Sequence, residues 1–209
     1  MILKNLIASI WQKAACTNDR LFRKGCDFSS WETNDELGIP EGKGNKYQPS
    51  SDGLIKVLDK LQVREDACII DIGCGKGKAM YMMSKFPFKE INGIDLSEEM
   101  VSIANANFSR LAEPRCVAIN ADAESYSDYD KYTFFYMFNS VPKGVFEKTM
   151  KNICDNIKKN PRTCYFIYHN PVYSSWVENN TGFRLVARKK GVLGWLDYHI
   201  FEYKLEECL

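Results

Sequence analysis

The fold of this 209-residue chain is decided by one stretch, Ile69-Ile-Asp-Ile-Gly-Cys-Gly-Lys-Gly-Lys-Ala-Met80. Its apolar, β-branched start, interrupted only by Asp71, predicts a strand buried on both faces of a parallel sheet. Gly73, Gly75 and Gly77 then permit backbone conformations closed to other residues and leave space beside the backbone for a ligand. The helix that follows begins with N–H groups that lack partners within the helix. The stretch therefore predicts a strand, a tight loop and a helix start beside a polar ligand.

The glycine spacing disfavours two common kinds of nucleotide site. In the dinucleotide fingerprint Gly-x-Gly-x-x-Gly, the third glycine would stand where this chain has Lys78. A phosphate-binding P-loop needs four residues between its glycines, followed by Gly-Lys-Ser/Thr, and the stretch has neither feature. Nicotinamide or flavin dinucleotides and nucleoside triphosphates are accordingly disfavoured as ligands.

Strand and helix patterns alternate on both sides of the glycines. Apolar residues at helical spacing predict a helix from Leu54 to about Val63, and a second helix from Lys78 to Phe86. Ser97 is a good N-cap for a third helix, which runs to Phe108. The other predicted elements are strands at 88–95, 116–119, 131–138, 163–168, 183–188 and 199–205, and a helix at 146–157. This order predicts an α/β fold with a Rossmann-like, doubly wound, mostly parallel sheet and an antiparallel C-terminal strand pair.

Three acids follow successive predicted strands. Asp71 lies in the first strand, Asp95 ends the second, and Asp122 comes shortly after the third. Parallel winding brings the carboxyl ends of these strands to one edge of the sheet. Asp95 stands one helix and one strand after the glycines, where an acid can accept both ribose hydroxyls of a nucleoside. Asp122 stands where a carboxylate can bond an adenine amino group.

Composition limits the classes of function. The length fits one sizeable domain with an added segment, and 45% hydrophobic with 26% charged residues is ordinary for a globular protein. A net charge of +1 gives no general attraction to nucleic acid or to an anionic membrane. The eight cysteines form no C-x-x-C pair, which favours a reduced, cytoplasmic setting. Zinc is poorly supported, since His169 and His199 are the two histidines, and we expect no metal.

The first 50 residues are expected to form an extension to the domain at 51–209. Apolar residues between Ile2 and Trp11 recur at helical spacing, interrupted by Lys4 and Asn5, so we expect an amphipathic helix rather than a signal peptide. Residues 17–51 are polar and rich in turn formers, and they read as a loop that is a possible lid. Its aromatic residues either fold over a ligand or pin the loop to the core. They are Phe28, Trp31 and Tyr47.

These motifs together resemble those of class I S-adenosylmethionine-dependent methyltransferases. Asp71-Ile-Gly-Cys-Gly-Lys-Gly77 is similar to motif I of that family, and the strand–helix layout extends the resemblance from Ser51 to the C-terminus. More narrowly, four segments resemble a poorly characterised group of small microbial methyltransferases, which is similar at motif level to the non-SET histone-lysine methyltransferases. The segments are Tyr47-Gln-Pro49, Asp71–Lys78, Phe86-Pro-Phe88 before Asn92–Ser97, and Tyr168-His-Asn-Pro171.

The resemblance implies a site for S-adenosylmethionine. The glycine loop is expected to hold the methionine part, Asp95 the ribose hydroxyls, and Asp122 with Ala123 the adenine. The full set of expected cofactor-binding residues is Asp71, Gly73, Cys74, Gly75, Gly77, Asp95, Leu96, Asp122, Ala123 and Asn139.

The acceptor side is less defined in the sequence. Asn139 is the position from which many relatives orient the acceptor, but Asn139-Ser-Val-Pro142 departs from the Asn/Asp-Pro-Pro-aromatic motif of adenine amino-methylating enzymes. Methylation of a nucleic-acid base is therefore disfavoured. His169 is a candidate general base because its intrinsic pKa lies near neutrality, although a histidine at a strand end is often structural. Asn170, Tyr47 and Tyr173 are candidate acceptor contacts.

Three functions are compatible with these residues. The first is methyl transfer to a small-molecule or protein acceptor, with Asn139 and His169 as the candidate catalytic residues. The second is a non-catalytic partner or regulatory protein that binds S-adenosylmethionine, and the third, less favoured, is an NAD-dependent oxidoreductase. The acceptor and the oligomeric state are left open by the sequence.

Overall fold

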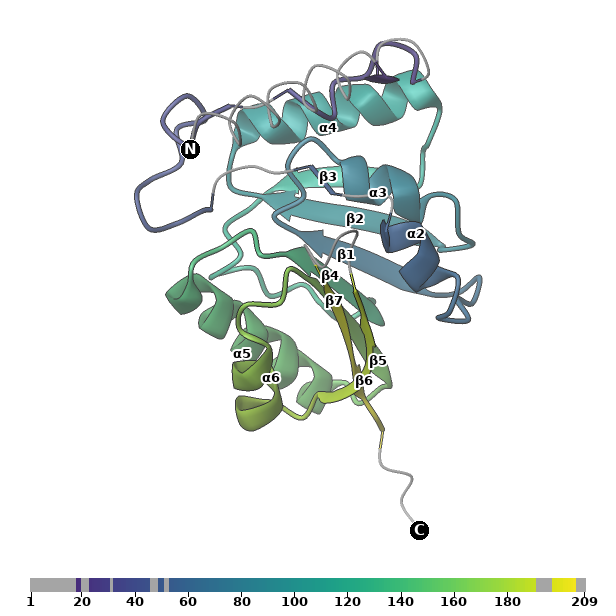
Figure 1. Ribbon diagram of the computed structural model, residues 1–209, viewed down its shortest axis with the longest axis vertical. Helices are drawn as coiled ribbons and strands as arrows, with labels where there is room; N and C mark the ends of the chain where they lie inside the picture. Colours follow the sequence, from purple (N-terminus) through teal and green to yellow (C-terminus); the bar gives the residue numbers. More distant parts are fainter. Residues whose placement is uncertain are drawn as a thin grey trace.

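A seven-stranded sheet forms the centre of the protein. The computed structural model describes residues 18–19, 23–30, 32–45, 49–50, 53–190 and 197–205, and within them the strand order is β3-β2-β1-β4-β5-β7-β6 (Figure 1). The predicted helix at Ile2–Trp11, and the residues Trp31 and Tyr47, lie outside the described residues. The strands are β1 Cys68–Ile72, β2 Glu90–Asp95, β3 Cys116–Asn120, β4 Phe134–Phe138, β5 Cys164–His169, β6 Arg184–Lys189 and β7 Tyr198–Tyr203.

The direction of the strands confirms the predicted fold class. Strands β1 to β5 pair in parallel, whereas β7 pairs antiparallel with both β5 and β6. All five residues of β1 are buried, as expected for a central parallel strand covered on both faces. Asp71 of β1 lies beside Gly93 of β2 and Tyr136 of β4 in the register. Asp71 and Tyr136 therefore share one face near the carboxyl edge of the sheet.

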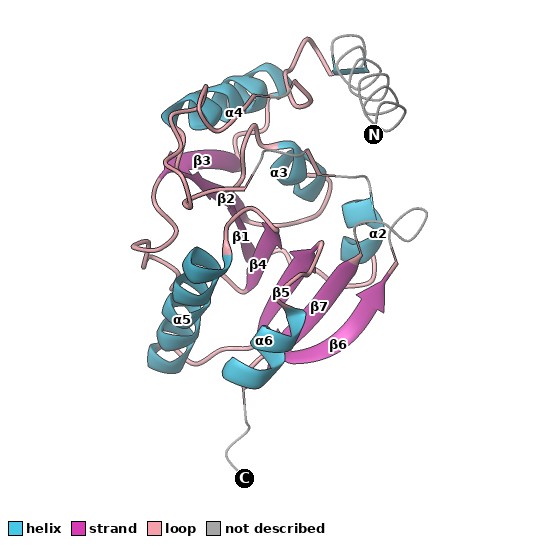
Figure 2. Ribbon diagram, turned by 60° about the vertical axis from the view of Figure 1, so that its left-hand side comes forward, coloured by secondary structure: helices cyan, strands magenta, loops and turns pink. Residues whose placement is uncertain are grey.

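Helices cover both faces of the sheet. The helices are α2 Gly53–Leu58, α3 Lys78–Met83, α4 Glu98–Leu111, α5 Lys143–Lys159 and α6 Ser174–Asn180. Helices α2, α3 and α4 lie on one face and α5 and α6 on the other (Figure 2). Side chains of the first three helices share one apolar cluster with the sheet, and side chains of α5 and α6 share a second cluster with it. The molecule thus has the three layers of a doubly wound fold.

The start of α4 follows from its sequence. The Ser97 hydroxyl accepts the backbone N–H of Met100 at 3.3 Å, which satisfies one of the orphan donors of the first turn. Glu98 and Glu99 add negative charge beside the positive end of the helix dipole. This confirms Ser97 as the predicted cap, directly after the end of β2.

Two predicted boundaries lie several residues away from those in the structure, and one helix was not predicted. Helix α2 ends at Leu58 rather than near Val63, because Lys60 and Leu61 donate to the carbonyls three residues back and the chain turns. Strand β4 begins at Phe134 rather than at residue 131, since residues 129–132 form a turn. Helix α6 was not predicted, because in its short sequence only Val177 is buried and no apolar periodicity marks it.

None of the described helices is both long and apolar enough to cross a membrane.

The junction between the glycine loop and α3 depends on Gly77. Its φ of 82° lies in the left-handed region, and a methyl group added to it would overlap the Phe108 ring of α4. We expect Gly77→Ala to lower the free energy of unfolding by about 2–4 kcal/mol through backbone strain and overpacking. Urea denaturation measures the change.

Gly144 is the matched control for this prediction. It lies near the start of α5 with open space around its Cα, so Gly144→Ala should raise the free energy of unfolding by up to about 1 kcal/mol. Equal effects of the two substitutions would contradict the account of Gly77.

Candidate functional site

A cavity opens at the carboxyl ends of the parallel strands. Its empty volume, including the part open to solvent, is about 920 Å³. The cavity wall includes eight of the predicted cofactor residues, and they are Asp71, Gly73, Cys74, Gly75, Asp95, Leu96, Asp122 and Ala123. Gly77 and Asn139 are not part of the wall, although Lys78, Phe138 and Ser140 beside them are.

The glycine loop is held between the end of β2 and the loop after β4. The N–H groups of Gly73 and Cys74 donate to the carbonyl of Ile94 in β2, at 2.8 and 3.0 Å. Gly73 has a φ of 75°, and any side chain on it would overlap Ser140 in the loop after β4. The Ser140 hydroxyl donates to the Ile72 carbonyl at 2.7 Å. The loops after β1 and β4 therefore approach each other so closely that glycine is required at position 73.

Asp95 ties the glycine loop to the end of β2. One carboxylate oxygen accepts the Gly75 N–H at 2.8 Å and the other accepts the Ser97 N–H at 3.0 Å. A carboxylate has about four acceptor positions, so both oxygens keep capacity for further donors such as hydroxyls. Burial raises the pKa of Asp95, and the bonds from the N–H groups of Ser97, Gly75 and Leu96 partly oppose this.

Asp71 places a second carboxyl group at the base of the cavity. Burial first, and the negative charge of Asp95 second, raise its pKa well above the usual aspartate value. In the described part of the chain, no lysine or arginine forms an ion pair with Asp71 or Asp95. The base of the cavity therefore favours a ligand that carries positive charge.

Asp122 lines the cavity beside two charged neighbours. Its carboxylate accepts the Glu124 N–H at 2.9 Å and pairs with Lys43 at 3.3 Å. Lys43 also forms a close ion pair with Glu124. The bond to Glu124 first, and the bond to Asp122 second, raise the pKa of Lys43. Lys43 comes from the N-terminal segment, so this ion pair holds that segment against the loop after β3.

His169 does not reach the cavity directly. Its side chain is fully buried, and its ring stacks between Phe138 and Tyr198, with centroids 3.7 and 4.0 Å away. Its Nδ1 lies 3.1 Å from the Tyr136 hydroxyl, which in turn lies 2.8 Å from the Ser50 hydroxyl. Tyr136 and Ser50 both line the cavity, whereas His169 does not. A general base must lie within hydrogen-bond reach of the acceptor, directly or through a mediating group, so the role of His169 as the base stays a prediction.

The remaining acceptor-side predictions also fall away from the cavity wall. Asn170 has a φ of 50° and donates its N–H to Asp197, as a turn residue does. Tyr173 packs against Phe146 of α5, at 5.0 Å between ring centroids, on the opposite face of the sheet. The physical reason is α6, which turns the chain after β5 back onto that face. Tyr47 lies outside the described residues.

The N-terminal segment supplies wall residues that the sequence did not single out. They are Leu37, Ile39, Lys43, Gly44, Asn45, Pro49 and Ser50. Asn45 is fixed to the loop after β4, since its N–H donates to the Ser140 carbonyl and its side-chain amide to the Asn139 carbonyl, at 2.9 and 2.7 Å. The one sequence signal for this wall is the apolar Leu37-Gly-Ile39 within a polar stretch. We call residues 32–45 the cover segment.

Comparisons with known proteins agree with this geometry. Residues 69–160 match a family model described as a methyltransferase domain. The chain has the fold of class I S-adenosylmethionine-dependent methyltransferases. The match begins in β1, contains the glycine loop, Asp95 and Asp122, and ends just after α5.

Curated relatives of the methyltransferase domain share only part of their length with it. Phosphoethanolamine N-methyltransferase 1 of Arabidopsis thaliana is 32% identical over 105 residues, which cover 48% of this chain and 21% of the relative. The Caenorhabditis elegans sterol 4-C-methyltransferase strm-1 is 27% identical over 159 residues, which cover 69% of this chain and 47% of that protein. The chain thus spans about a fifth of the phosphoethanolamine enzyme and less than half of the sterol enzyme.

Solved structures share the fold of the methyltransferase domain. An RNA methyltransferase from Salinibacter ruber, in complex with S-adenosyl-L-homocysteine, superposes with a TM-score of 0.57 at 14% identity. The match covers 78% of this chain and 97% of that one. At this identity the likeness concerns the fold, which is that of S-adenosylmethionine-dependent methyltransferases.

The cavity fits this cofactor on two observations. S-adenosylmethionine carries a sulfonium and an ammonium group. The buried Asp71 and the half-buried Asp95 offer carboxyl groups without a lysine or arginine partner in the described part of the chain. Asp95 also keeps acceptor positions for hydroxyl groups while it holds the glycine loop.

Asp95 gives a direct test of the site. We expect Asp95→Ala to weaken binding of S-adenosylhomocysteine at least tenfold, or about 1.4 kcal/mol, because it removes the hydroxyl acceptor and frees the glycine loop. Isothermal titration calorimetry measures the affinity. Asp66→Ala is the control, since Asp66 forms an exposed ion pair with Arg64 just before β1 and should leave the affinity unchanged. Unchanged affinity in Asp95→Ala would refute the ribose assignment.

Proposed function

We propose that this protein transfers a methyl group from S-adenosylmethionine to a small acceptor bound beneath the cover segment. The observation that carries the proposal is the composition of the cavity wall. The wall combines the acids of the strand ends with apolar residues of the cover segment, the end of β4 and the start of α5. These apolar residues include Leu37, Ile39, Phe138, Val141 and Val145.

The proposed cofactor contacts follow from the positions of the acids. The glycine loop and Asp71 would hold the methionine part, Asp95 the ribose hydroxyls, and Asp122 with Ala123 the adenine. Cys74 and Leu96 would pack against the cofactor as neighbours of these residues. When bound, the cofactor supplies a methyl group on a sulfonium that is already reactive, so the chain has to align the acceptor and accept one proton.

The proton is proposed to leave through hydroxyl groups rather than directly to an imidazole. Ser50 and Tyr136 reach the cavity, and His169 lies behind Tyr136 at hydrogen-bond distance. Burial raises the pKa of Tyr136 well above that of a free phenol, so its hydroxyl stays protonated and passes a proton on only as it receives one. Asn139 remains a candidate to orient the acceptor, because it stands between Phe138 and Ser140, which both line the cavity.

Several observations favour a small acceptor over a macromolecule. The cover segment forms part of the cavity wall and is fixed at two points, by Lys43 at the loop after β3 and by Asn45 at the loop after β4. The net charge of +1 offers no general attraction to nucleic acid. The two curated relatives described above are also named for small acceptors, phosphoethanolamine and a sterol.

A cytoplasmic location is part of the proposal. Six cysteines in the described residues are free and buried, although the chain has cysteines enough for disulfides. Free buried thiols are usual in proteins of a reducing compartment.

Transfer of a labelled methyl group tests the function. Wild-type protein is incubated with methyl-labelled S-adenosylmethionine and a cell extract that has been separated into filtrate and macromolecules. We expect label to enter a compound of the filtrate, and we expect Asp95→Ala to lower the rate at least tenfold at a subsaturating cofactor concentration.

Other outcomes are equally informative. Label in the protein fraction would overturn the small acceptor but keep methyl transfer. Binding of S-adenosylhomocysteine without any transfer, across varied extracts, would favour a non-catalytic partner protein.

A further inference from the structure

Lys76 of the glycine loop turns away from the cavity. Its side chain is fully buried and is not part of the cavity wall, whereas Lys78, two residues later, is. A lysine among glycines would ordinarily be read as a ligand for an anion. The surroundings of Lys76 give it another role.

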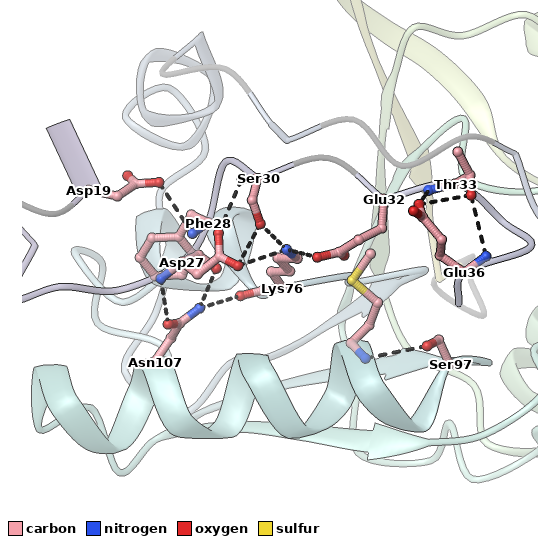
Figure 3. Close-up of polar contacts among 11 residues, drawn as sticks. Asp19, Asp27, Phe28, Ser30, Glu32, Thr33, Glu36, Lys76, Ser97 and Asn107 are labelled. Atoms are coloured by element: carbon pink, nitrogen blue, oxygen red, sulfur yellow. Dashed lines mark hydrogen bonds and ion pairs between the residues drawn. The ribbon is translucent and has the colours of Figure 1, made fainter. Parts of the chain in front are cut away.

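The Lys76 ammonium is surrounded by oxygens of the N-terminal segment. It pairs with Asp27 at 2.8 Å and with Glu32 at 2.7 Å, and it donates a short hydrogen bond to the Ser30 hydroxyl (Figure 3). An ammonium has three donors, and these three oxygens match them. Burial by itself raises the pKa of Asp27, but the bonds from Lys76 and Ser30 outweigh it and bring the pKa below the usual value.

Asn107 of α4 strengthens the same attachment. Its side-chain oxygen accepts the Asp27 N–H at 3.0 Å, and its amide donates to the carbonyls of Asp27 and Lys76, at 2.9 and 3.1 Å (Figure 3). One side chain thus joins the N-terminal segment, α4 and the glycine loop. Phe28 adds an apolar contact, since its ring stacks on Tyr81 of α3 at 5.6 Å.

The cover segment begins at this attachment. Glu32 is its first residue, and a turn follows in which the Glu36 carboxylate accepts both the N–H and the hydroxyl of Thr33, at 2.7 and 2.9 Å. Leu37 and Ile39 then line the cavity. The side-chain amide of Asn34 donates to the Gly44 carbonyl at 2.9 Å, which closes the segment into a loop.

We propose that Lys76 is a positioning residue that links the cofactor loop to the acceptor wall. Its backbone belongs to the loop that bounds the cofactor part of the cavity, and its side chain holds the first residue of the cover segment. Ordering the glycine loop around a bound cofactor therefore also orders Leu37 and Ile39 over the acceptor position. The inference rests on the proposed function, because it assigns one end of the cavity to the cofactor and the other to the acceptor.

Hydrogen exchange with and without S-adenosylhomocysteine tests the link without knowledge of the acceptor. In the wild type, bound S-adenosylhomocysteine should slow exchange of the backbone amides of residues 32–45 at least fivefold. In Lys76→Met the slowing should fall below twofold, measured at ligand concentrations that saturate each protein. Lys131→Met is the matched control, since Lys131 forms an ion pair with Glu90 at the opposite edge of the sheet and should keep the full slowing.

Two further variants separate positioning from loss of stability. Asp27→Asn/Glu32→Gln/Lys76→Met leaves no unpaired carboxylate and should still lack the slowing. Glu32→Gln keeps Lys76 with its other partners and should give an intermediate slowing, so it serves if Lys76→Met does not fold.

Three results would overturn the inference. Full slowing in Lys76→Met, or its return in the triple variant, would show that the lysine does not carry the link. Binding of S-adenosylhomocysteine to the wild type without slowing at residues 32–45 would refute the link and leave the cofactor assignment intact. Absence of binding to the wild type would refute the proposed function and this inference together.

Discussion

The site depends on two neighbouring carboxyl groups that are withdrawn from water, the buried Asp71 and the half-buried Asp95. Each has a pKa raised by burial, and in the described residues neither has a lysine or arginine partner. Burial therefore disfavours the charged form of both carboxyl groups in the absence of ligand. A ligand with positive groups relieves this cost, whereas the diphosphate of a dinucleotide would add to it. The electrostatics thus agree with the glycine spacing in favouring S-adenosylmethionine over NAD.

The surrounding structure keeps these carboxyl groups in place. Asp95 can hold the Gly75 N–H only because the glycine loop folds back onto the end of β2, and Gly73 lets that loop lie against Ser140. Lys76 extends the same loop outward to the cover segment. Cofactor site and acceptor wall are in this way parts of one connected arrangement, built from loops at one edge of the sheet.

The sequence predicted the sheet, the direction of its strands and the position of the acids at one edge. Apolar periodicity is a local signal, and the alternation of strands and helices implies parallel winding. The sequence did not predict where His169 and Tyr173 lie. The position of His169 depends on the stacking of its ring between Phe138 and Tyr198. The position of Tyr173 depends on helix α6, which has too few buried residues to produce an apolar periodicity. The sequence also did not predict that the Lys76 side chain points away from the cavity, since its partners stand 44 to 49 positions earlier in the chain.

Thermal unfolding of wild type and Asp71→Asn across pH, with and without S-adenosylmethionine, tests the central claim most directly. Folding raises the pKa of Asp71 above the usual carboxyl pKa of 3.8. The contribution of Asp71 to the free energy of unfolding is therefore fully present below pH 3.8 and is lost as the pH rises through the raised pKa. At neutral pH, Asp71→Asn should therefore unfold at a higher temperature than ligand-free wild type and gain less from the cofactor. A lower unfolding temperature, with an undiminished gain from the cofactor, would contradict the account.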